Sequence, residues 1–373
     1  MKKLSFLLIS LLTFACQPKT SESIKSMNYE FLIGSYTDSP EEGISLLTFS
    51  PSNHSLSIST IAPEIINPSF VLADEERVFA VEETEGPKGG QILSFQWDET
   101  HQSLQKVDEK NTEGNHPCHI AYRDGFLVVS NYSGGNFSIL KVREDGSLTP
   151  VQLIQHSGSS INAARQEAAH VHSANFSPDG KFLLVADLGT DRIYSYEFNK
   201  ENPEPAQLLE EIPMTPGDGP RHLSFSPSGN EVFVVQELTA VLEVFDYKDG
   251  KLQSKQRLSL ISEGFEGAVG AAEVRVSSDG NFIYASNRGD ANTISVFSKQ
   301  EDGSYSLVEH VPSGGIMPRN FILTADGKYV LVAHQASENI VVFERDQESG
   351  KLKPISLEVT VPKPVYLFDI SKY

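Results

Sequence analysis

One pattern of hydrophobic and polar positions recurs along most of the chain. A short alternating segment leads to a turn containing Asp-Gly or Ser-Gly, and a continuous apolar segment follows and ends in polar residues. A third segment ending in Phe, Tyr or Val comes next, and then a loop and a fourth segment. Alternation predicts a half-buried strand, whereas a short apolar run predicts a strand buried on both faces. The clearest copies of the first two segments span 68–83, 117–132, 170–188, 220–238, 272–288 and 318–335.

The spacing of these copies predicts the fold class. With a further first segment at 364–370, the starts are separated by about 49 residues on average, which is the period of a propeller blade. We therefore expect an all-β, seven-bladed β-propeller with four antiparallel strands in each blade. The turns at 177–181, 277–281 and 324–328 carry Asp-Gly and predict hairpins. A calcium loop, the alternative for these turns, needs an alternating Asp/Asn series that they lack.

The two ends of the described pattern complement each other. Residues 364–370 have the pattern of a first strand with no others after it. Residues 29–36, 43–50 and 55–60 have the patterns of a second, third and fourth strand with no first strand before them. Pairing the two ends completes one blade, closes the ring and removes free sheet edges. The sequence therefore predicts a single propeller domain over 29–373.

The N-terminal segment has the features of an export signal. Two lysines precede an apolar run that ends at Ala15 and is too short to span a bilayer, and Cys16 follows. This order resembles a bacterial lipoprotein signal, in which the cysteine after a small residue is lipidated. We expect a signal peptide over 1–16 with lipidation at Cys16, a flexible tether over 17–28, and a location in the bacterial cell envelope. An ordinary cleaved signal is the alternative, and it also predicts export.

Charge and cysteine content exclude several classes of protein. Lys and Arg number 30 against 50 Asp and Glu, so the net charge is −20 and the chain lacks the basic surface that binds nucleic acid. The same charge repels anionic lipids, so we expect membrane contact only through the lipid anchor. Two cysteines cannot form a disulfide framework or a Cys-rich zinc site, and we expect Cys118 to be a free, buried thiol. We expect a monomer with no cofactor and no metal.

Polar residues gather where the first strand of each blade begins and the second ends. These positions are adjacent in a hairpin, and the first strand of a blade is innermost, so their side chains should converge on one mouth of the central channel. From the first strands they are His116, Cys118, His119, His170, His172, Arg221, His222, Glu273, Arg319 and Asn320. From the second strands they are Glu82, Glu83, Asn131, Tyr132, Asp187, Glu237, Asn287, Arg288 and His334. We expect this mouth to be the functional site.

Two groups in this mouth have more than one interpretation. His170 and His172 lie at i and i+2 on a strand and should point the same way, so they could hold a metal, but the sequence identifies no third ligand. Arg221, Arg288 and Arg319 come from three blades. They predict either ion pairs with internal carboxylates or the recognition of an anionic ligand. Both interpretations of the arginines are compatible with the sequence.

A series of short motifs extends over roughly residues 29–370. They are NPSF (67–70), NHPCH (115–119), NYSGGN (131–136), HVHSANFSPDGKFLLVADL (170–188), GPRHLSFSPSG (219–229), QEL (236–238), AEVRVSSDG (272–280), YASNRG (284–289), PRNF (318–321) and SENIVVF (337–343). Together they resemble the lactonase family of seven-bladed propellers, whose best-known members are bacterial 6-phosphogluconolactonases. Two positions depart from the family pattern: Ala169 stands where a proline is usual, and His334 where an asparagine is usual.

The resemblance implies roles for particular residues. Carboxymuconate-lactonising members of the family have a histidine, a glutamate and two arginines implicated in catalysis. These match the His170/His172 pair, Glu237, Arg221 and Arg288. We therefore expect the catalytic residues to be Glu237, His170, His172 and Arg221. We expect the substrate-binding residues to be Arg288, Arg319, His222, His119, Glu273 and Asn131.

These roles predict a metal-free lactonase acting on a small, sugar-derived lactone. Water would attack the ring carbonyl, with Glu237 or a histidine of the pair as general base and an arginine stabilising the oxyanion. The hairpin should bring Glu237 close to Arg221, which lowers the pKa of a carboxylate, although a structural salt bridge would have the same geometry. The alternatives are a muconate-type lactonising enzyme and a non-catalytic, exported propeller that binds a sugar or a protein partner.

Overall fold

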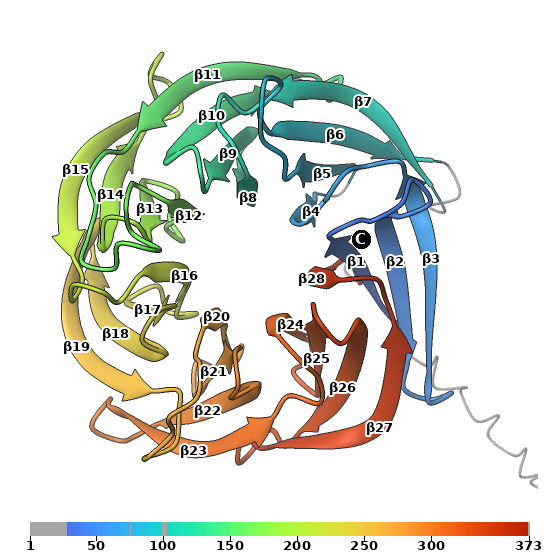
Figure 1. Ribbon diagram of the computed structural model, residues 1–373, viewed down its shortest axis with the longest axis vertical. Coiled ribbons are helices and arrows are strands. Elements are labelled where there is room, and N and C mark those ends of the chain that lie inside the picture. Colours follow the sequence, from blue (N-terminus) through green and yellow to red (C-terminus); the bar gives the residue numbers. More distant parts are fainter. Residues whose placement is uncertain (1–27, 75, 99–102, 372–373) are drawn as a thin grey trace, which may run out of the picture.

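The structure is a computed structural model, and it describes residues 28–74, 76–98 and 103–371. Within these residues, seven antiparallel sheets of four strands each surround a central channel (Figure 1). The predicted seven-bladed all-β propeller is therefore confirmed. The expected signal peptide with Cys16, and all of the expected tether except its last residue, lie outside the described residues. No helix in the described ranges has the length and apolarity needed to cross a membrane.

Each blade contributes one strand to each of four concentric positions. The innermost strands are β28 (Pro364–Asp369), β4 (Val71–Ala73), β8 (Pro117–Arg123), β12 (Val171–Phe176), β16 (Pro220–Phe225), β20 (Ala271–Val276) and β24 (Pro318–Leu323). The second strands are β1 (Tyr29–Ser35), β5 (Arg77–Glu82), β9 (Phe126–Asn131), β13 (Phe182–Asp187), β17 (Glu231–Gln236), β21 (Phe282–Asn287) and β25 (Tyr329–His334). The third strands are β2 (Gly43–Ser50), β6 (Gln91–Trp97), β10 (Asn136–Val142), β14 (Arg192–Phe198), β18 (Val241–Lys248), β22 (Thr293–Lys299) and β26 (Asn339–Arg345). The outermost strands are β3 (Ser55–Pro63), β7 (Leu104–Asn111), β11 (Leu148–Gln155), β15 (Ala206–Pro213), β19 (Lys251–Ser259), β23 (Tyr305–Pro312) and β27 (Leu352–Thr360).

The hydrophobic pattern explains which strand occupies which position. Every residue of the second strands β9, β17 and β21 is buried, as their continuous apolar sequences predict. The outermost strands β19 and β27 instead alternate between half-buried and exposed residues, because only one of their faces meets the neighbouring blade. A strand's distance from the channel axis therefore follows from its own sequence.

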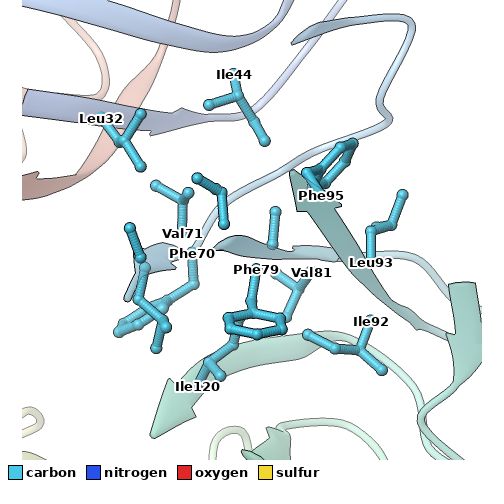
Figure 2. Close-up of a cluster of buried hydrophobic side chains, with 14 of the residues drawn as sticks. Leu32, Ile44, Phe70, Val71, Phe79, Val81, Ile92, Leu93, Phe95 and Ile120 are labelled. Atoms are coloured by element: carbon cyan, nitrogen blue, oxygen red, sulfur yellow. The ribbon is translucent and has the colours of Figure 1, made fainter. Parts of the chain in front are cut away.

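The core lies between the blades. One cluster of buried side chains joins Leu32 of β1, Phe79 of β5 and Ile120 of β8, which belong to three successive blades (Figure 2). Phe70, just before β4, belongs to the same cluster. Each blade therefore buries its apolar faces only against its neighbours, and the ring has to close for every blade to be covered.

The predicted Asp-Gly hairpin turns are confirmed. In the turn between β12 and β13, the Gly180 N–H donates to the Ser177 carbonyl at 2.8 Å, and Gly180 has a φ of +72° that favours glycine. Asp179 accepts hydrogen bonds from the Ser177 hydroxyl at 2.6 Å and from the Lys181 N–H at 3.1 Å. The aspartate carboxylate therefore stabilises its own turn.

The two ends of the described chain close the ring as predicted. The innermost strand β28 pairs antiparallel with β1, and Phe31 lies opposite Asp369. The blade thus formed has the order β28-β1-β2-β3, with one strand from the C-terminus and three from the N-terminal part. Strand β1 is therefore not left with an unpaired inner edge, because the other end of the chain supplies the innermost strand β28.

A β-bulge recurs near the start of the innermost strands, and the hydrophobic pattern does not predict it. In β8, β12, β16, β20 and β24 the register shifts by one residue between the first residue and the strand interior. A bulge inserts one extra residue and re-aims the side chains beside it. The residues at these bulges are Cys118, His172, Arg221, His222, Ala272, Glu273 and Arg319.

Candidate active site

The candidate site is built around the buried carboxylate of Glu237, which directly follows β17. Its side chain is only 6% exposed. The Oε2 atom of Glu237 lies 3.0 Å from Nε of Arg221 and 3.0 Å from Nη2 of Arg288. Nε2 of His172 lies 3.9 Å from the same oxygen. The structure thus brings together four of the residues that the sequence assigned to the channel mouth, from three different blades.

Backbone carbonyls hold the two buried arginines in place. Arg221 lies at the bulge of β16 and donates through Nη1 to the Ala272 carbonyl of the next blade. Arg288, just after β21, donates through Nε to the Gly270 carbonyl at 2.9 Å. The Nε of Arg221 has no hydrogen-bond acceptor, so its contact with Glu237 is an ion pair rather than a hydrogen bond. One buried N–H donor at the site therefore remains unused.

Burial and charge set the protonation states of this cluster. Burial by itself would raise the pKa of Glu237, but Arg288 and Arg221, with His172 and Arg165, hold it well below the usual range of a carboxyl. Burial, reinforced by the nearby Arg221, lowers the pKa of His172 well below that of a free imidazole. Burial and the neighbouring arginines also lower the pKa of Arg221, to about 9. At neutral pH the site therefore contains an ionised Glu237, a neutral His172 and charged arginines.

A third arginine reaches the same carboxylate, and sequence reasoning missed it. Arg165 lies in the loop over 157–169, between β11 and β12. Its Nη2 atom is 2.6 Å from Oε1 of Glu237 and donates to the Tyr132 hydroxyl at 3.3 Å. No periodic pattern marks this residue, because it belongs to a loop that is longer than the corresponding connections of the other blades. Three guanidinium groups thus contact one carboxylate, which leaves a surplus of two positive charges.

The two histidines of the predicted pair have different surroundings. Both rings contact Tyr132: the ring of His170 stacks on it with centroids 4.5 Å apart, and the ring of His172 meets it edge-on at 5.4 Å. The Nε2 atom of His170 lies 3.2 Å from the exposed Glu167. The Nδ1 atom of His172 lies 3.8 Å from the sulfur of Cys118, which is free and buried as predicted. His172 is therefore the histidine of the pair that faces Glu237.

Arg319 forms another wall of the same mouth. It is half-buried and donates to the Tyr36 hydroxyl at 3.1 Å. Tyr36 in turn donates to the carboxylate of Glu83 at 3.0 Å. These two hydrogen bonds link β24, the innermost strand that carries Arg319, to the loops that follow β1 and β5. Arg319 is close enough to the Glu237 cluster for its positive charge to lower the pKa values of both Arg221 and His172.

Comparison with known proteins identifies the family. The family model described as lactonase, 7-bladed beta-propeller, matches residues 30–368. The chain belongs to this lactonase family. It is 32% identical over 339 residues to a 6-phosphogluconolactonase of Formosa agariphila, a match that covers 88% of this chain and 96% of the relative. It is 30% identical over 344 residues to a 6-phosphogluconolactonase of Bacillus subtilis, covering 89% and 96% of the two chains. The solved structure of a periplasmic gluconolactonase from Pseudomonas aeruginosa superposes with a TM-score of 0.85 at 33% identity, covering 92% of this chain and 99% of that one.

In this lactonase, three of the predicted substrate-binding residues lie further along the channel than Glu237. His119, His222 and Glu273 line a cavity of 620 Å³ that extends toward the C-terminal ends of the innermost strands. Nδ1 of His222 lies 3.2 Å from Oε2 of Glu273, and the ring of His222 is 5.2 Å from that of His172. The bulges explain this division, because they send neighbouring residues of one strand to different levels of the channel.

Asn131 takes part in packing between chain segments. It is fully buried at the end of β9, and its amide nitrogen donates to the Thr112 carbonyl at 3.1 Å and to Asn136 at 2.8 Å. The structure therefore places this predicted substrate-binding residue among protein hydrogen bonds, away from the contacts of Glu237. A polar strand end in a wet channel has the same sequence signature whether it faces a ligand or its own backbone.

Proposed function

We propose that this lactonase-family protein hydrolyses a sugar-derived lactone to its hydroxy acid at the mouth around Glu237. The observation that carries the proposal is the buried Glu237 carboxylate, contacted by three guanidinium groups beside a neutral histidine. Such a site offers a proton acceptor together with positive charge for a developing oxyanion. The names of the relatives, 6-phosphogluconolactonase and gluconolactonase, support the same substrate class.

The proposed reaction needs water and side chains of this chain. A water oxygen attacks the ring carbonyl carbon while Glu237 accepts a proton from that water. The carbonyl oxygen becomes an oxyanion, which we assign to Arg221, because its Nε–H is buried without an acceptor. Collapse of this intermediate breaks the bond to the ring oxygen, which takes up the proton as the new hydroxyl group. We propose that His172, whose Nε2 lies 3.9 Å from Glu237, passes the proton from Glu237 to the ring oxygen.

The remaining predicted residues have supporting roles in this proposal. Arg288 keeps Glu237 ionised, and Arg319 holds polar or anionic substituents of the lactone, since guanidinium groups bind carboxylates and phosphates through paired hydrogen bonds. His170 orients Tyr132 by stacking on it at 4.5 Å. His119, His222 and Glu273 form the floor of the mouth, and the ring of His222 packs against that of His172.

An assay of acid release would test the proposal. The purified protein would be titrated at constant pH with a panel of aldonolactones and their phosphorylated forms. We expect steady acid release with at least one sugar lactone. Release with none would leave a binding propeller, and isomerisation of muconates without acid release would identify a lactonising enzyme. Either result would overturn the proposal.

We also propose that the protein acts in the cell envelope, tethered through a lipid on Cys16. The order of the N-terminal segment supports this, as does the similarity to a periplasmic gluconolactonase. Metabolic labelling with a fatty-acid analogue should label the protein and follow it to the membrane fraction. Cys16→Ser should abolish both results, and unchanged labelling of that variant would contradict the tether.

A further inference from the structure

The loop over 157–169 places a half-exposed arginine directly on the buried carboxylate of the site. The side chain of Arg165 is 42% exposed, whereas that of Glu237 is 6% exposed and that of Arg221 is 2% exposed. A molecule approaching from solvent therefore meets Arg165 before it meets the other partners of Glu237. Among the described residues, Arg165 is the one group within hydrogen-bond distance of Oε1 of Glu237.

The backbone of this loop is firmly held on both sides of Arg165. Gln166, which is fully buried, donates through its amide to the Leu188 carbonyl at 2.9 Å. Its side-chain oxygen accepts the Asn162 N–H at 3.1 Å, and its carbonyl accepts the Ser160 N–H at 2.9 Å. The backbone N–H of Arg165 donates to the Asn162 carbonyl at 3.0 Å. The loop is therefore anchored, and the flexible part is the long side chain of Arg165.

Both oxygens of Glu237 are occupied in this arrangement. Oε2 faces Arg221 and Arg288 at 3.0 Å, and Oε1 faces Arg165 at 2.6 Å. A carboxylate paired on both oxygens is a weak proton acceptor, because every positive neighbour stabilises its ionised form. Arg221 and Arg288 are fixed by backbone carbonyls, so Oε1 becomes available only when the Arg165 guanidinium moves away.

We propose that Arg165 is a specificity-determining residue that couples recognition of an anionic lactone to activation of Glu237. This inference rests on the proposed function. In the free protein Arg165 covers Oε1 of Glu237. A phosphate or carboxylate on the substrate draws the guanidinium away and binds it, and Oε1 is then open to the attacking water. Arg221 and Arg288 remain on Oε2 throughout.

The chemistry of the groups explains the preference for anions. The three guanidinium groups leave a surplus of two positive charges over Glu237, which a phosphate monoester can balance. A phosphate offers Arg165 two parallel hydrogen bonds, so the exchange of one carboxylate for another oxyanion preserves its charge-assisted bonding. A neutral lactone offers no such replacement, and with it Arg165 stays on Glu237. The loss of one cation on binding also raises the proton affinity of Glu237.

The test compares Arg165→Gln with Arg192→Gln, a control that removes the same charge elsewhere. The side chain of Arg192, on β14, is 38% exposed, and its Nε atom lies 3.3 Å from Oε2 of Glu211 on β15. Each variant would be assayed with 6-phosphogluconolactone and with gluconolactone. We expect Arg165→Gln to raise KM for the phosphorylated lactone about tenfold or more, the range of a charge-assisted hydrogen bond, and to leave KM for gluconolactone unchanged.

The dependence of kcat/KM on pH gives a second measurement. Its acidic limb should move to higher pH in Arg165→Gln, because Glu237 has lost a neighbouring cation and its pKa rises. Arg192→Gln should behave like the wild type.

A binding measurement separates failure of this inference from failure of the proposed function. Calorimetry with 6-phosphogluconate and gluconate needs no turnover, and we expect Arg165→Gln to weaken only the phosphorylated compound. If no lactone is hydrolysed but this selective loss is seen, the proposed function is wrong and the anion recognition stands. Equal losses on both lactones together with a lowered Tm would show that Arg165 is structural, and would overturn the inference. A wild-type pH profile in Arg165→Gln would overturn the coupling.

Discussion

At the scale of single residues, Glu237 determines the charge balance of the mouth, and in our proposal it also acts as the general base. It is ionised because cations from three other segments surround it, and these cations are tolerated at close range because it is ionised. Removing one member of a buried ionic cluster leaves uncompensated charge, which is strongly destabilising. In the proposed mechanism, activity and stability are therefore linked at this residue, and a useful experiment has to measure them separately.

Glu237→Gln should lower kcat for the hydrolysed lactone by about 10²–10⁴, the size of a general acid–base contribution. It should also cost about 3–5 kcal/mol of unfolding free energy at neutral pH, because Arg221 and Arg288 lose their counter-charge. Steady-state kinetics on the folded fraction and denaturant titration would measure the two effects. The control is Glu211→Gln, which removes a carboxylate that is 50% exposed and should change neither.

Acid titration of stability gives a second measurement on the same variant. The folded-state pKa of Glu237 is depressed, so its ionisation stabilises the fold above the unfolded pKa, and this contribution disappears as pH falls through the folded value. The difference in unfolding free energy between wild type and Glu237→Gln should therefore shrink as the pH falls below about 4. A difference that stays constant with pH would mean that the charge of Glu237 does not stabilise the fold. Normal turnover by the folded variant would rule out its role as base.

At the scale of elements, the ends of the second strands organise the starts of the innermost ones. Oδ1 of Asp187, at the end of β13, accepts the His170 N–H at 2.8 Å. Oδ1 of Asn287, at the end of β21, accepts the Gly270 N–H at 2.9 Å. In both blades, the last residue of the second strand thus supplies an acceptor oxygen to the backbone just before the innermost strand. In the first of these blades, the acceptor holds the junction between the loop over 157–169 and strand β12, which carries His172.

Asp187→Ala should therefore destabilise the protein more than Asp187→Asn. The carboxylate accepts the N–H groups of His170, Gly189 and Thr190, and unpaired buried donors cost about 1–3 kcal/mol each. Asparagine keeps the acceptor oxygen that Asn287 supplies in another blade. Denaturant unfolding of both variants would measure the difference. Equal destabilisation would instead assign the main effect to the hydrogen bond between Asp187 and His156, whose Nδ1 lies 2.9 Å from Oδ2.

At the scale of the whole molecule, the ring depends on one strand from the C-terminal end. β28 pairs with β1 and therefore covers the inner edge of that strand. It also packs beside the neighbouring innermost strands β24 and β4, so it completes the interfaces with both adjacent blades. Blades without neighbours expose their apolar faces, because each blade is covered only by the next. Closure is therefore a condition for the stability of the entire propeller.

A chain that ends at residue 362 should lose cooperative unfolding. Without β28, strand β1 presents an unpaired edge to the channel and to other molecules, which favours aggregation. Thermal unfolding followed by circular dichroism, with size-exclusion chromatography, would detect both effects. A chain that ends at Ser371 retains all of β28 and serves as the control. An unchanged melting transition in the shorter chain would contradict closure by β28.

The architecture of this protein could be predicted from its sequence. The strands, their order and the blade period follow from short-range hydrophobic periodicity, and the complementary ends predict the closed ring. The proximity of Glu237 and Arg221 was also predictable, because the pairing of β16 with β17 brings their neighbours together. These features depend on residues close together in the chain or on a pattern repeated in every blade.

The tertiary structure alone decided how the site is divided and covered. The bulges place His222 and Glu273 in the cavity further along the channel from Glu237, and no hydrophobic pattern specifies which strand gains an extra residue. Arg165 reaches Glu237 across 72 positions of sequence, from a loop that interrupts the repeat. Its position follows from the buried Gln166 that anchors the loop to the adjoining strand end. Side-chain direction and loop path depend on packing between blades, and that packing exists only once the ring has closed.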